Sequence, residues 1–367
     1  MNSFHSTSPC SLWVHPDDNT IIQILDQRFL PFTLITEDLK TDDDCLVAIR
    51  DMHVRGAPLI GVTAAFGIYL GLLHCREGRY DTCCDAVVTK LAEARPTAVN
   101  LFYALEFVRD AVLKEQREEA KPEAAFCAAC TLMEREIAAC RRIGEYGLSL
   151  VEEAARKKKG DPVRILTHCN AGWLACIRYG TATAPIYLAH EKGIPVHVWV
   201  DETRPLNQGS RLTAWELQQA GVPHTVITDN AGGYLMQKGM VDMVIVGSDR
   251  VCLNGDIANK TGTYLKALAA SDNQIPFYVA FPSSTIDTKL ESGEAIPIEE
   301  RSPDEVHFMT GFGNNGLQKI RITPFHSEAN NPAFDITPAR LITGFITERG
   351  VCQPNRKEIL QLFPEIA

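Results

Sequence analysis

Hydrophobic residues recur every three to four positions over most of the first 155 residues, which is the period of helices with one buried face. A short hairpin is expected before them, around Ile21 to Leu34. The pattern then predicts five helices, with a break allowed in the last: Asp43–Met52, Pro58–His74, Cys84–Ala94, Val99–Lys114 and Pro122–Val151. Pro96 separates two of them.

The pattern changes after the charged segment Ala155 to Asp161. Five apolar runs of strand length follow: Val163–Thr167, Val196–Val200, His224–Ile227, Met243–Val246 and Phe277–Phe281. Segments of helical composition lie between them: Trp173–Lys192, Arg211–Ala220, Gly232–Lys238 and Gly262–Ala270. Apolar strands that alternate with helices predict a parallel sheet covered on both faces. We therefore expect an α/β protein with a mostly helical N-terminal domain (residues 1–155) and a parallel-sheet C-terminal domain (residues 156–367).

The composition is that of a soluble globular protein, with 45% hydrophobic and 22% charged residues. A net charge of −10, with no basic run longer than Arg156 to Lys159, argues against general affinity for nucleic acid. Residues 1–19 lack the cationic start and apolar core of a secretion signal, so we expect a cytoplasmic protein. Ala57 to His74 is uncharged, but its Gly, Ala and Thr content favours a buried helix over a membrane span.

The twelve cysteines follow no regular framework, which is typical of a reducing compartment where most thiols are buried. Cys127 and Cys130 form the one C-x-x-C pair, and without a second pair they favour a structural role over a metal site. We expect the same structural role for Cys176, Cys252 and Cys352. Neither a metal nor a cofactor is expected.

Polar residues follow four of the predicted strands. They are His168-Cys169-Asn170-Ala171-Gly172, Asp201-Glu202-Thr203-Arg204, Thr228-Asp229-Asn230 and Gly247-Ser248-Asp249-Arg250. The carboxyl ends of parallel strands meet at one edge of a sheet, where ligands bind. Each segment by itself is typical of a plain loop, but the four together favour an active site at this edge.

Two of these residues have the properties of catalytic groups. Cys169 precedes a predicted helix start, where the helix dipole would stabilise a thiolate or a developing oxyanion. Asp249 follows four apolar residues, and desolvation would raise the pKa of its carboxyl toward neutrality. The alternative for Asp249 is an ion pair with Arg250 or Arg204, and the sequence favours neither hypothesis.

Two further segments indicate a phosphate site. Asn259 and Thr261 are candidate helix caps, and Lys260 would lie in the first helical turn, where a cation is unfavourable unless an anion binds. Arg55-Gly56-Ala57-Pro58 also opens a predicted helix. Arg95 precedes a proline in another turn. Each arginine alone is typical of a solvated surface, so the hypothesis depends on their acting together.

Seven motifs carry a resemblance to a known family: VRGAPLIGVTAA, THCNAG, DETRPLNQGSRLTAWEL, TDNAGG, GSDRVCLNGDIANKTGTY, IEERSP and NPAFDITPARLITGFITERG. They resemble the family of methylthioribose-1-phosphate isomerases, which includes the alpha, beta and delta subunits of eukaryotic translation initiation factor two B. The resemblance covers the chain from about residue 25 to the C-terminus. It implies a Rossmann-like C-terminal domain, a homodimer and a role in methionine salvage. The implied reaction is an aldose–ketose isomerisation of 5-methylthioribose 1-phosphate to 5-methylthioribulose 1-phosphate, without a cofactor.

The family's catalytic cysteine and aspartate fall on Cys169 and Asp249. Its substrate-binding positions fall on Arg55, Gly56, Ala57, Arg95, Gln208, Asn259 and Lys260. Ring opening would take a proton from Asp249, while Cys169 removes the C2 proton or stabilises the developing charge. Transfer as a proton and transfer as a hydride both fit these residues.

The chain departs from the family pattern at Trp173, Ile177, Arg178 and Asn207, all of which bear on the shape of the pocket. We expect Arg178 to face solvent or the dimer interface. Apolar residues would then form the methylthio pocket: Pro58, Leu59, Trp173 and Leu174. Two alternatives stay open: a ribose-1,5-bisphosphate isomerase and a non-catalytic regulatory subunit.

Overall fold

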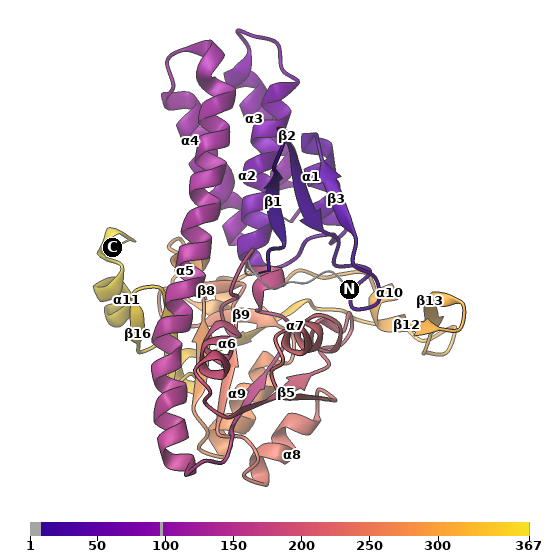
Figure 1. Ribbon diagram of the computed structural model, residues 1–367, viewed down its shortest axis with the longest axis vertical. Helices are drawn as coiled ribbons and strands as arrows, with labels where there is room; N and C mark the ends of the chain where they lie inside the picture. Colours follow the sequence, from indigo (N-terminus) through magenta and orange to yellow (C-terminus); the bar gives the residue numbers. More distant parts are fainter. Residues whose placement is uncertain (1–8, 96–97, 367) are drawn as a thin grey trace.

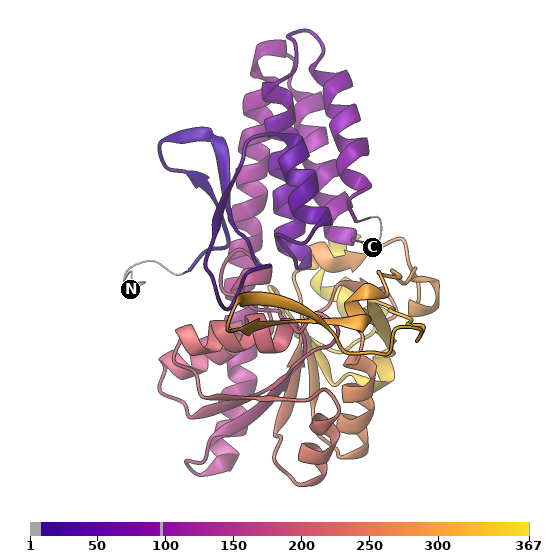
Figure 2. The same ribbon diagram turned by 90° about the vertical axis from the view of Figure 1, so that its right-hand side faces the viewer.

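The computed structural model describes residues 9–95 and 98–366. A helical part with a small antiparallel sheet stands above a large sheet that is covered by helices (Figure 1). Figure 2 shows the same two layers after a quarter turn. The expected α/β class, with helices first and a large mainly parallel sheet after them, is confirmed. Pro96 lies outside the described residues.

The small sheet contains β1 (Leu12–His15), β2 (Asp18–Leu25) and β3 (Thr36–Leu39), in that order. Only β2 overlaps the region Ile21 to Leu34 where the hairpin was predicted, and its partners lie on either side of that region. The helix α1 (Asp42–Arg50) follows. It begins with a capping box, because the side chains of Thr41 and Asp44 each accept a hydrogen bond from the other residue's backbone N–H.

The next three helices form a bundle: α2 (Ala57–Leu73), α3 (Tyr80–Ala92) and α4 (Val99–Lys114). The central one, α2, has 16 buried residues out of 17, which confirms the expected buried helix. Its glycines let neighbours approach, since a Cβ at Gly61 would lie 2.8 Å from the Asn100 carbonyl oxygen. Within the described part of the chain, none of the helices is long and apolar enough to cross a membrane.

The helix α5 (Lys121–Lys158), preceded by the 3-10 turn Glu118–Ala120, runs unbroken along both layers (Figure 1). Its first half, including Leu132, packs in the core of the helical bundle. Its second half, including Ile143 and Val151, packs against the large sheet. The charged segment Ala155 to Asp161, where the hydrophobic pattern changes, begins inside this helix. The last helical residue is Lys158, and Lys159 follows it with a left-handed φ of 52°.

The large sheet has seven strands: β4 (Val163–Thr167), β5 (Val196–Asp201), β6 (His224–Ile227), β7 (Met243–Val246), β10 (Phe277–Ala280), β15 (Gly344–Thr347) and β16 (Gly350–Cys352). Their order is β16-β15-β10-β7-β4-β5-β6, and every neighbouring pair is parallel except β15 with β16. All five predicted strands are present to within one residue at their ends.

Helices cover both faces of this sheet. On one face α5, α6 (Ala184–Glu191) and α7 (Ala214–Gln219) pack on residues such as Ile165 and Ile245. On the other face α8 (Ala231–Gln237), α9 (Thr263–Asp272) and α11 (Arg356–Leu362) pack on Leu166 and Val244. The alternation of neighbouring residues between faces explains why these strands are apolar throughout.

Two predicted helices are shorter in the structure. In the segment Trp173–Lys192 only a 3-10 turn (Trp173–Ala175) and α6 are helical, and Ile177 and Tyr179 between them have left-handed φ values of 68° and 66°. The segment before α7 forms one turn of π-helix, Gly209–Thr213. Hydrophobic periodicity does not report these turns, because they form through contacts with distant residues.

The sequence did not indicate the remaining elements. A second sheet joins β11 (Ile286–Asp287), β8 (Arg250–Cys252), β9 (Ile257–Lys260) and β14 (Phe334–Thr337). The hairpin of β12 (Phe308–Gly313) and β13 (Gly316–Arg321) follows the short helix α10 (Asp304–His307) and projects from the body of the molecule (Figure 1). Most of these strands are short, and β11 and β14 pair with strands far away along the chain, so no local period marks the second sheet.

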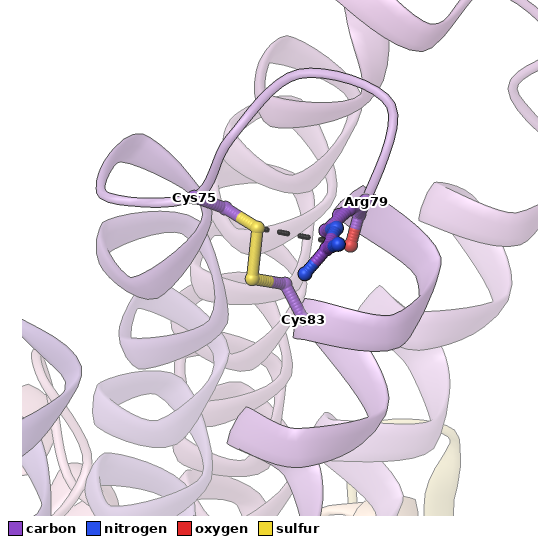
Figure 3. The surroundings of a disulfide bond; sticks show 3 residues. All are labelled: Cys75, Arg79 and Cys83. Carbon is purple, nitrogen blue, oxygen red and sulfur yellow. Dashed lines mark hydrogen bonds between the residues drawn. A yellow bond between two sulfur atoms is a disulfide. The ribbon is translucent and has the colours of Figure 1, made fainter.

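Two of the cysteines are joined in a disulfide. Cys75, in the connection between α2 and α3, forms a disulfide with Cys83 in the first turn of α3, beside Arg79 (Figure 3). The expected reducing compartment, with mostly buried thiols, did not include this bond. Cys176, Cys252 and Cys352 are buried as expected, whereas Cys127, which is exposed, and Cys130 lie on α5 as free thiols.

Candidate active site

A cavity opens where β4 and β7 end, next to the start of α2. These two strands are neighbours at the centre of the sheet, and the chain leaves them toward opposite edges. Such a switch point forms a crevice outside the carboxyl ends of the strands. The cavity wall includes Arg55, Gly56, Ala57, His168, Cys169, Asn170, Ser248, Asp249 and Asn259.

Cys169 lies at the base of this cavity with 8% of its surface exposed. Its φ of 65° turns the chain sharply after β4. The turn is held at both ends: the Cys169 N–H donates to Thr203 Oγ1 at 2.9 Å, and its carbonyl accepts from Thr213 Oγ1 at 2.7 Å. The expected helix start beside Cys169 is wrong, because α6 begins only at Ala184. Stabilisation of a Cys169 thiolate by a helix dipole from that side is therefore not expected.

Arg55 supplies the positive charge nearest to the thiol. Its Nη2 lies 3.8 Å from Cys169 Sγ and donates to the Asn170 carbonyl at 2.9 Å, while Nη1 donates to Asn170 Oδ1 at 2.6 Å. Gly56 and Ala57 begin α2, as predicted. Gly56 has a φ of 96°, and a Cβ there would lie 2.4 Å from that of Ala175, so only glycine fits.

Asp249 lies opposite, at the end of β7. Burial raises the pKa of its carboxyl, although the charges of Lys260, Arg95 and Arg55 act against the increase. This direction agrees with the prediction. The two arginines considered as partners bind other groups: Arg250 pairs with Asp287 at 3.4 Å, and Arg204 donates to the Val306 carbonyl at 2.9 Å.

A second cavity adjoins the first and shares Ala57 and Asp249 with it. Most of its other lining is apolar: Ile60, Ala98, Ile296, Pro297 and Phe334. Arg95 also lines it, and its guanidinium forms an ion pair with Glu299 at 3.0 Å. Burial opposes ionisation of Glu299, but Arg95 and Arg301 outweigh it and lower its pKa. Sequence reasoning missed Glu299, although it lies in the IEERSP motif.

Asn259 and Lys260 end strand β9 and do not lie in a helical turn, which corrects the prediction. The cap of α9 is also different: Asp335 on β14 accepts from the N–H groups of Gly262 and Tyr264. Lys260 is buried, and its ammonium lies 4.8 Å from the centre of the Phe334 ring. Burial lowers the pKa of the Lys260 ammonium. The nearby Cys169 and Asp249 act in the opposite direction but do not cancel this effect.

Two of the predicted substrate-binding residues, Lys260 and Gln208, line neither cavity. Lys260 is close enough to interact with Cys169 and Asp249. Gln208 precedes the π-helical turn and is 5% exposed. Among the described residues, its Oε1 has no hydrogen-bond partner.

Of the four polar strand ends, only those of β4 and β7 line the first cavity. The ends of β5 and β6 lie behind it. Asp201 bonds to the His168 ring at 2.9 Å and to Lys266 Nζ at 3.1 Å, and Asp229 accepts from the Thr203 N–H at 2.7 Å. Of the four strand ends, those of β4 and β7 meet at the central switch point and line the first cavity together.

The ring of His168 ties two parts of the site together, because its second nitrogen contacts the Thr261 carbonyl at 3.0 Å. Oxygen and nitrogen atoms of His168, Asp201 and Asp229 lie within 4.8 Å of one another, a spacing that suits a metal ion. However, the Lys266 ammonium already bonds to Asp201 there, and its charge opposes a cation.

The expected methylthio pocket is partly wrong. Trp173 and Leu174 pack in a separate cluster with Leu25, Leu30 and Leu212, and Leu59 is fully buried. Only Pro58 of the expected set lines the first cavity. Arg178 lines neither cavity. The residue is half-buried and its Nε is buried, so it does not face solvent fully, which was one of the two positions expected, and its place at a dimer interface stays a prediction.

Known proteins with the same architecture cover nearly the whole chain. A curated methylthioribose-1-phosphate isomerase from Desulfosudis oleivorans is 57% identical over 96% of both chains. The crystal structure of 5-methylthioribose 1-phosphate isomerase from Pyrococcus horikoshii is 36% identical, with a TM-score of 0.83 over 99% of this chain and all of that one. The delta subunit of translation initiation factor eIF-2B from A. fulgidus is also 36% identical, with a TM-score of 0.79 over 97% of this chain and all of that one.

The model of the initiation factor 2 subunit family matches residues 53–354. This range includes the start of α2, the large sheet and every residue that lines the two cavities. With relatives above half identity over almost its full length, the chain belongs to the initiation factor 2 subunit family.

Proposed function

We propose that this protein is an aldose–ketose isomerase that converts 5-methylthioribose 1-phosphate to 5-methylthioribulose 1-phosphate in methionine salvage, with Cys169 and Asp249 as its acid–base pair. The observation that carries the proposal is the meeting of a thiol and a carboxyl of raised pKa in one cavity, with the cations Arg55 and Lys260 beside them. The name carried by the 57% identical relative supports the same activity.

Ring opening is the first chemical task. The phosphate on the anomeric carbon blocks spontaneous opening to an aldehyde, so the ring oxygen must receive a proton as its bond to C1 breaks. Asp249 suits this step, because burial raises the pKa of its carboxyl and so favours the protonated form that can donate. The step leaves an electron-poor C1 and an ionised Asp249.

The second task moves a hydrogen from C2 to C1. Cys169 takes the C2 proton as a thiolate, and Arg55, 3.8 Å from its sulfur, stabilises that negative charge. Return of a proton to C1 and loss of the O2 proton give the ketone. Atoms are neither gained nor lost overall, so the reaction requires no outside oxidant or reductant.

The phosphate belongs in the first cavity. Arg55 lies there together with the N-terminus of the 17-residue helix α2 at Gly56 and Ala57, whose free N–H groups favour an anion. Lys260 is close enough to act on both Cys169 and Asp249. These groups offset the charge of a bound phosphate, which would be costly to bury unpaired.

The methylthio group belongs in the second cavity, on the other side of Asp249. Its apolar lining, with Ile60, Ile296 and Phe334, suits a polarisable thioether. The competing 5-phosphate of ribose 1,5-bisphosphate would meet Arg95 and Arg250 in this cavity, but ion pairs with Glu299 and Asp287 already offset the charges of these arginines. This arrangement disfavours the bisphosphate isomerase.

A turnover assay on purified protein with both sugar phosphates tests the proposal. We expect a clear preference in kcat/KM for the methylthio substrate. Turnover of only the bisphosphate would establish the sister activity. If neither substrate turns over while size-exclusion mass shows assembly with partner subunits, the regulatory-subunit alternative holds.

We further propose a homodimer in the cytoplasm and a domain limit near residues 155 and 156. The resemblance to the family supports the homodimer and the cytoplasmic location. Separate apolar cores in the helical part and around the large sheet support the domain limit. Size-exclusion mass of the purified protein tests the dimer, and limited proteolysis near the end of α5 tests the domain limit.

A further inference from the structure

Glu216 on α7 is completely buried, although it is a carboxylate. It lines neither of the two cavities. An ionised side chain away from water is stable only with dedicated partners. Its position therefore requires an explanation beyond packing.

Both oxygens of this carboxylate are surrounded by donors from the segment that follows Cys169. Oε1 accepts from Asn170 Nδ2 at 2.9 Å and from the Leu174 N–H at 3.1 Å. Oε2 accepts from the Trp173 N–H at 3.0 Å and from the Tyr187 hydroxyl at 2.9 Å. Burial raises the pKa of Glu216 to about 7, and these four hydrogen bonds act in the other direction, toward the ionised form.

The chain is shaped around the carboxylate. A Cβ at Gly172 would lie 1.8 Å from Glu216 Oε2, so only glycine lets the backbone pass at this distance. Thr213, at the end of the π-helical turn just before α7, holds Cys169, because its Oγ1 donates to the Cys169 carbonyl at 2.7 Å. Glu216 and Thr213 thus hold both ends of the turn that carries the thiol.

Asn170 connects Glu216 to the cavity. Its amide nitrogen donates to Glu216, which turns its Oδ1 toward Arg55, where it accepts a hydrogen bond of 2.6 Å. If the Asn170 amide were turned by 180°, its NH₂ group would face the Arg55 guanidinium, and two donors would oppose each other. Thr213 Oγ1 accepts from the same amide nitrogen at 3.2 Å, so Glu216, at the shorter distance of 2.9 Å, and Thr213 together determine which end of the Asn170 amide meets the guanidinium.

We propose that Glu216 is a positioning residue, which acts through Asn170 to orient Arg55 toward the phosphate and toward Cys169. This inference rests on the proposed isomerase function. Glu216 does not contact the substrate in this arrangement. Its contribution is the geometry of the cationic side of the cavity.

The variant Glu216→Gln tests the proposal, because the amide has nearly the same shape but presents N–H groups to donors. We expect kcat/KM to fall about 10²-fold, the effect of a small displacement of a catalytic group. We also expect inorganic phosphate to lose most of its stabilising effect on the midpoint of thermal unfolding. Tyr187→Phe is the matched control, since it removes a donor to the other oxygen, Oε2, and leaves the bond from Asn170 to Oε1 in place. Its kcat/KM should stay within about threefold of wild type.

A second variant, Asn170→Ala, interrupts the connection while leaving Glu216 its three other donors. It should fold and lose the phosphate effect to the same degree, even if Glu216→Gln does not fold. A purely structural role for Glu216 would lower the unfolding midpoint but leave kcat/KM and the phosphate effect intact below that midpoint. That outcome, or an unchanged phosphate effect in Asn170→Ala, would overturn the inference. The phosphate measurement needs no turnover, so failure of the proposed function would show separately in the wild-type assay.

Discussion

The Nη2 atom of Arg55 lies 3.8 Å from the sulfur of Cys169, although the two residues are 114 positions apart. The guanidinium comes from the entrance of α2 and the thiol from the end of β4. This contact joins the helical part of the chain to the sheet at the point where the chemistry is proposed. The predictions below depend on it and on the groups that surround it.

Replacing Cys169 by Ser should remove nearly all turnover and leave the fold intact. A hydroxyl ionises far less readily than a thiol, and the smaller oxygen keeps the contacts of the turn. The loss should be on the order of 10²- to 10⁴-fold in kcat, as for acid–base groups in general. Steady-state kinetics together with circular dichroism checks it, with Cys352→Ser as a control, because Cys352 is a buried free cysteine that lines neither cavity. A variant that keeps more than about a tenth of the rate contradicts a catalytic role.

Asp249→Asn should reduce kcat by a similar factor, because the amide keeps the shape of the carboxyl but cannot supply its proton. The pH profile provides the sharper measurement. Since burial raises the pKa of Asp249, the acid form persists to higher pH than for an exposed aspartate, and the basic limb of kcat/KM should move or vanish in the variant. Unchanged activity would transfer the acid role to another residue, with Asp201 or Glu202 next.

Inorganic phosphate should inhibit the enzyme competitively and raise the midpoint of thermal unfolding. The stabilisation follows mass action, about 2.7 kcal/mol when phosphate is at 100 times its dissociation constant. Lys260→Ala should weaken both effects, whereas Lys238→Ala on the far end of α8 should change neither. Indifference of the wild-type midpoint to phosphate would show that the anion site is misassigned.

Ile296→Ala should lower kcat/KM for the methylthio substrate by about tenfold or more, since it removes apolar contact from the second cavity. Ile298→Ala, two residues further on and 38% exposed, is the matched control.

Arg178→Ala should leave the preference between methylthio substrate and bisphosphate unchanged. A preference for the bisphosphate that disappears in Arg178→Ala would contradict the assignment.

Glu136 predicts a pH dependence of stability. This residue of α5 is buried, and burial raises its pKa to about 7, with Ser284 acting against the increase and Glu348 adding to it. Because the folded-state pKa lies above the unfolded value, stabilisation by the protonated form is complete at low pH and is lost as the pH rises through 7. The loss should reach at most about 3 kcal/mol.

Chemical denaturation of wild type and Glu136→Gln at pH 5.5 and pH 8.5 measures this effect. The variant should be more stable than wild type only at the higher pH. Glu134→Gln, which replaces an exposed residue of the same helix, should follow the wild type at both. Parallel pH dependence in wild type and Glu136→Gln would contradict the prediction.

Local patterns were sufficient for the elements whose burial is uniform along the chain. The strands around Ile165 and Ile245 are apolar because both faces of the sheet are covered, and α2 is apolar because neighbours surround it. The same alternation of strands and helices indicated where a ligand would bind. The residues of the site followed from motifs, and the structure brings all of them except Gln208 to the cavities or beside them.

Tertiary structure alone decided how these residues act. Lys260 reaches the site from a strand because β9 pairs with β14, and that pairing spans about seventy residues that no local period connects. The carboxylates of Glu299 and Glu216 carry no local mark that separates them from solvated glutamates. Their roles follow from what packs around them. Arg95 lies beside Glu299, and Glu216 accepts from three donors in the turn after Cys169 and from one on α6. A sequence pattern records which residues avoid water, but the partner of a buried charge is selected only when distant segments meet.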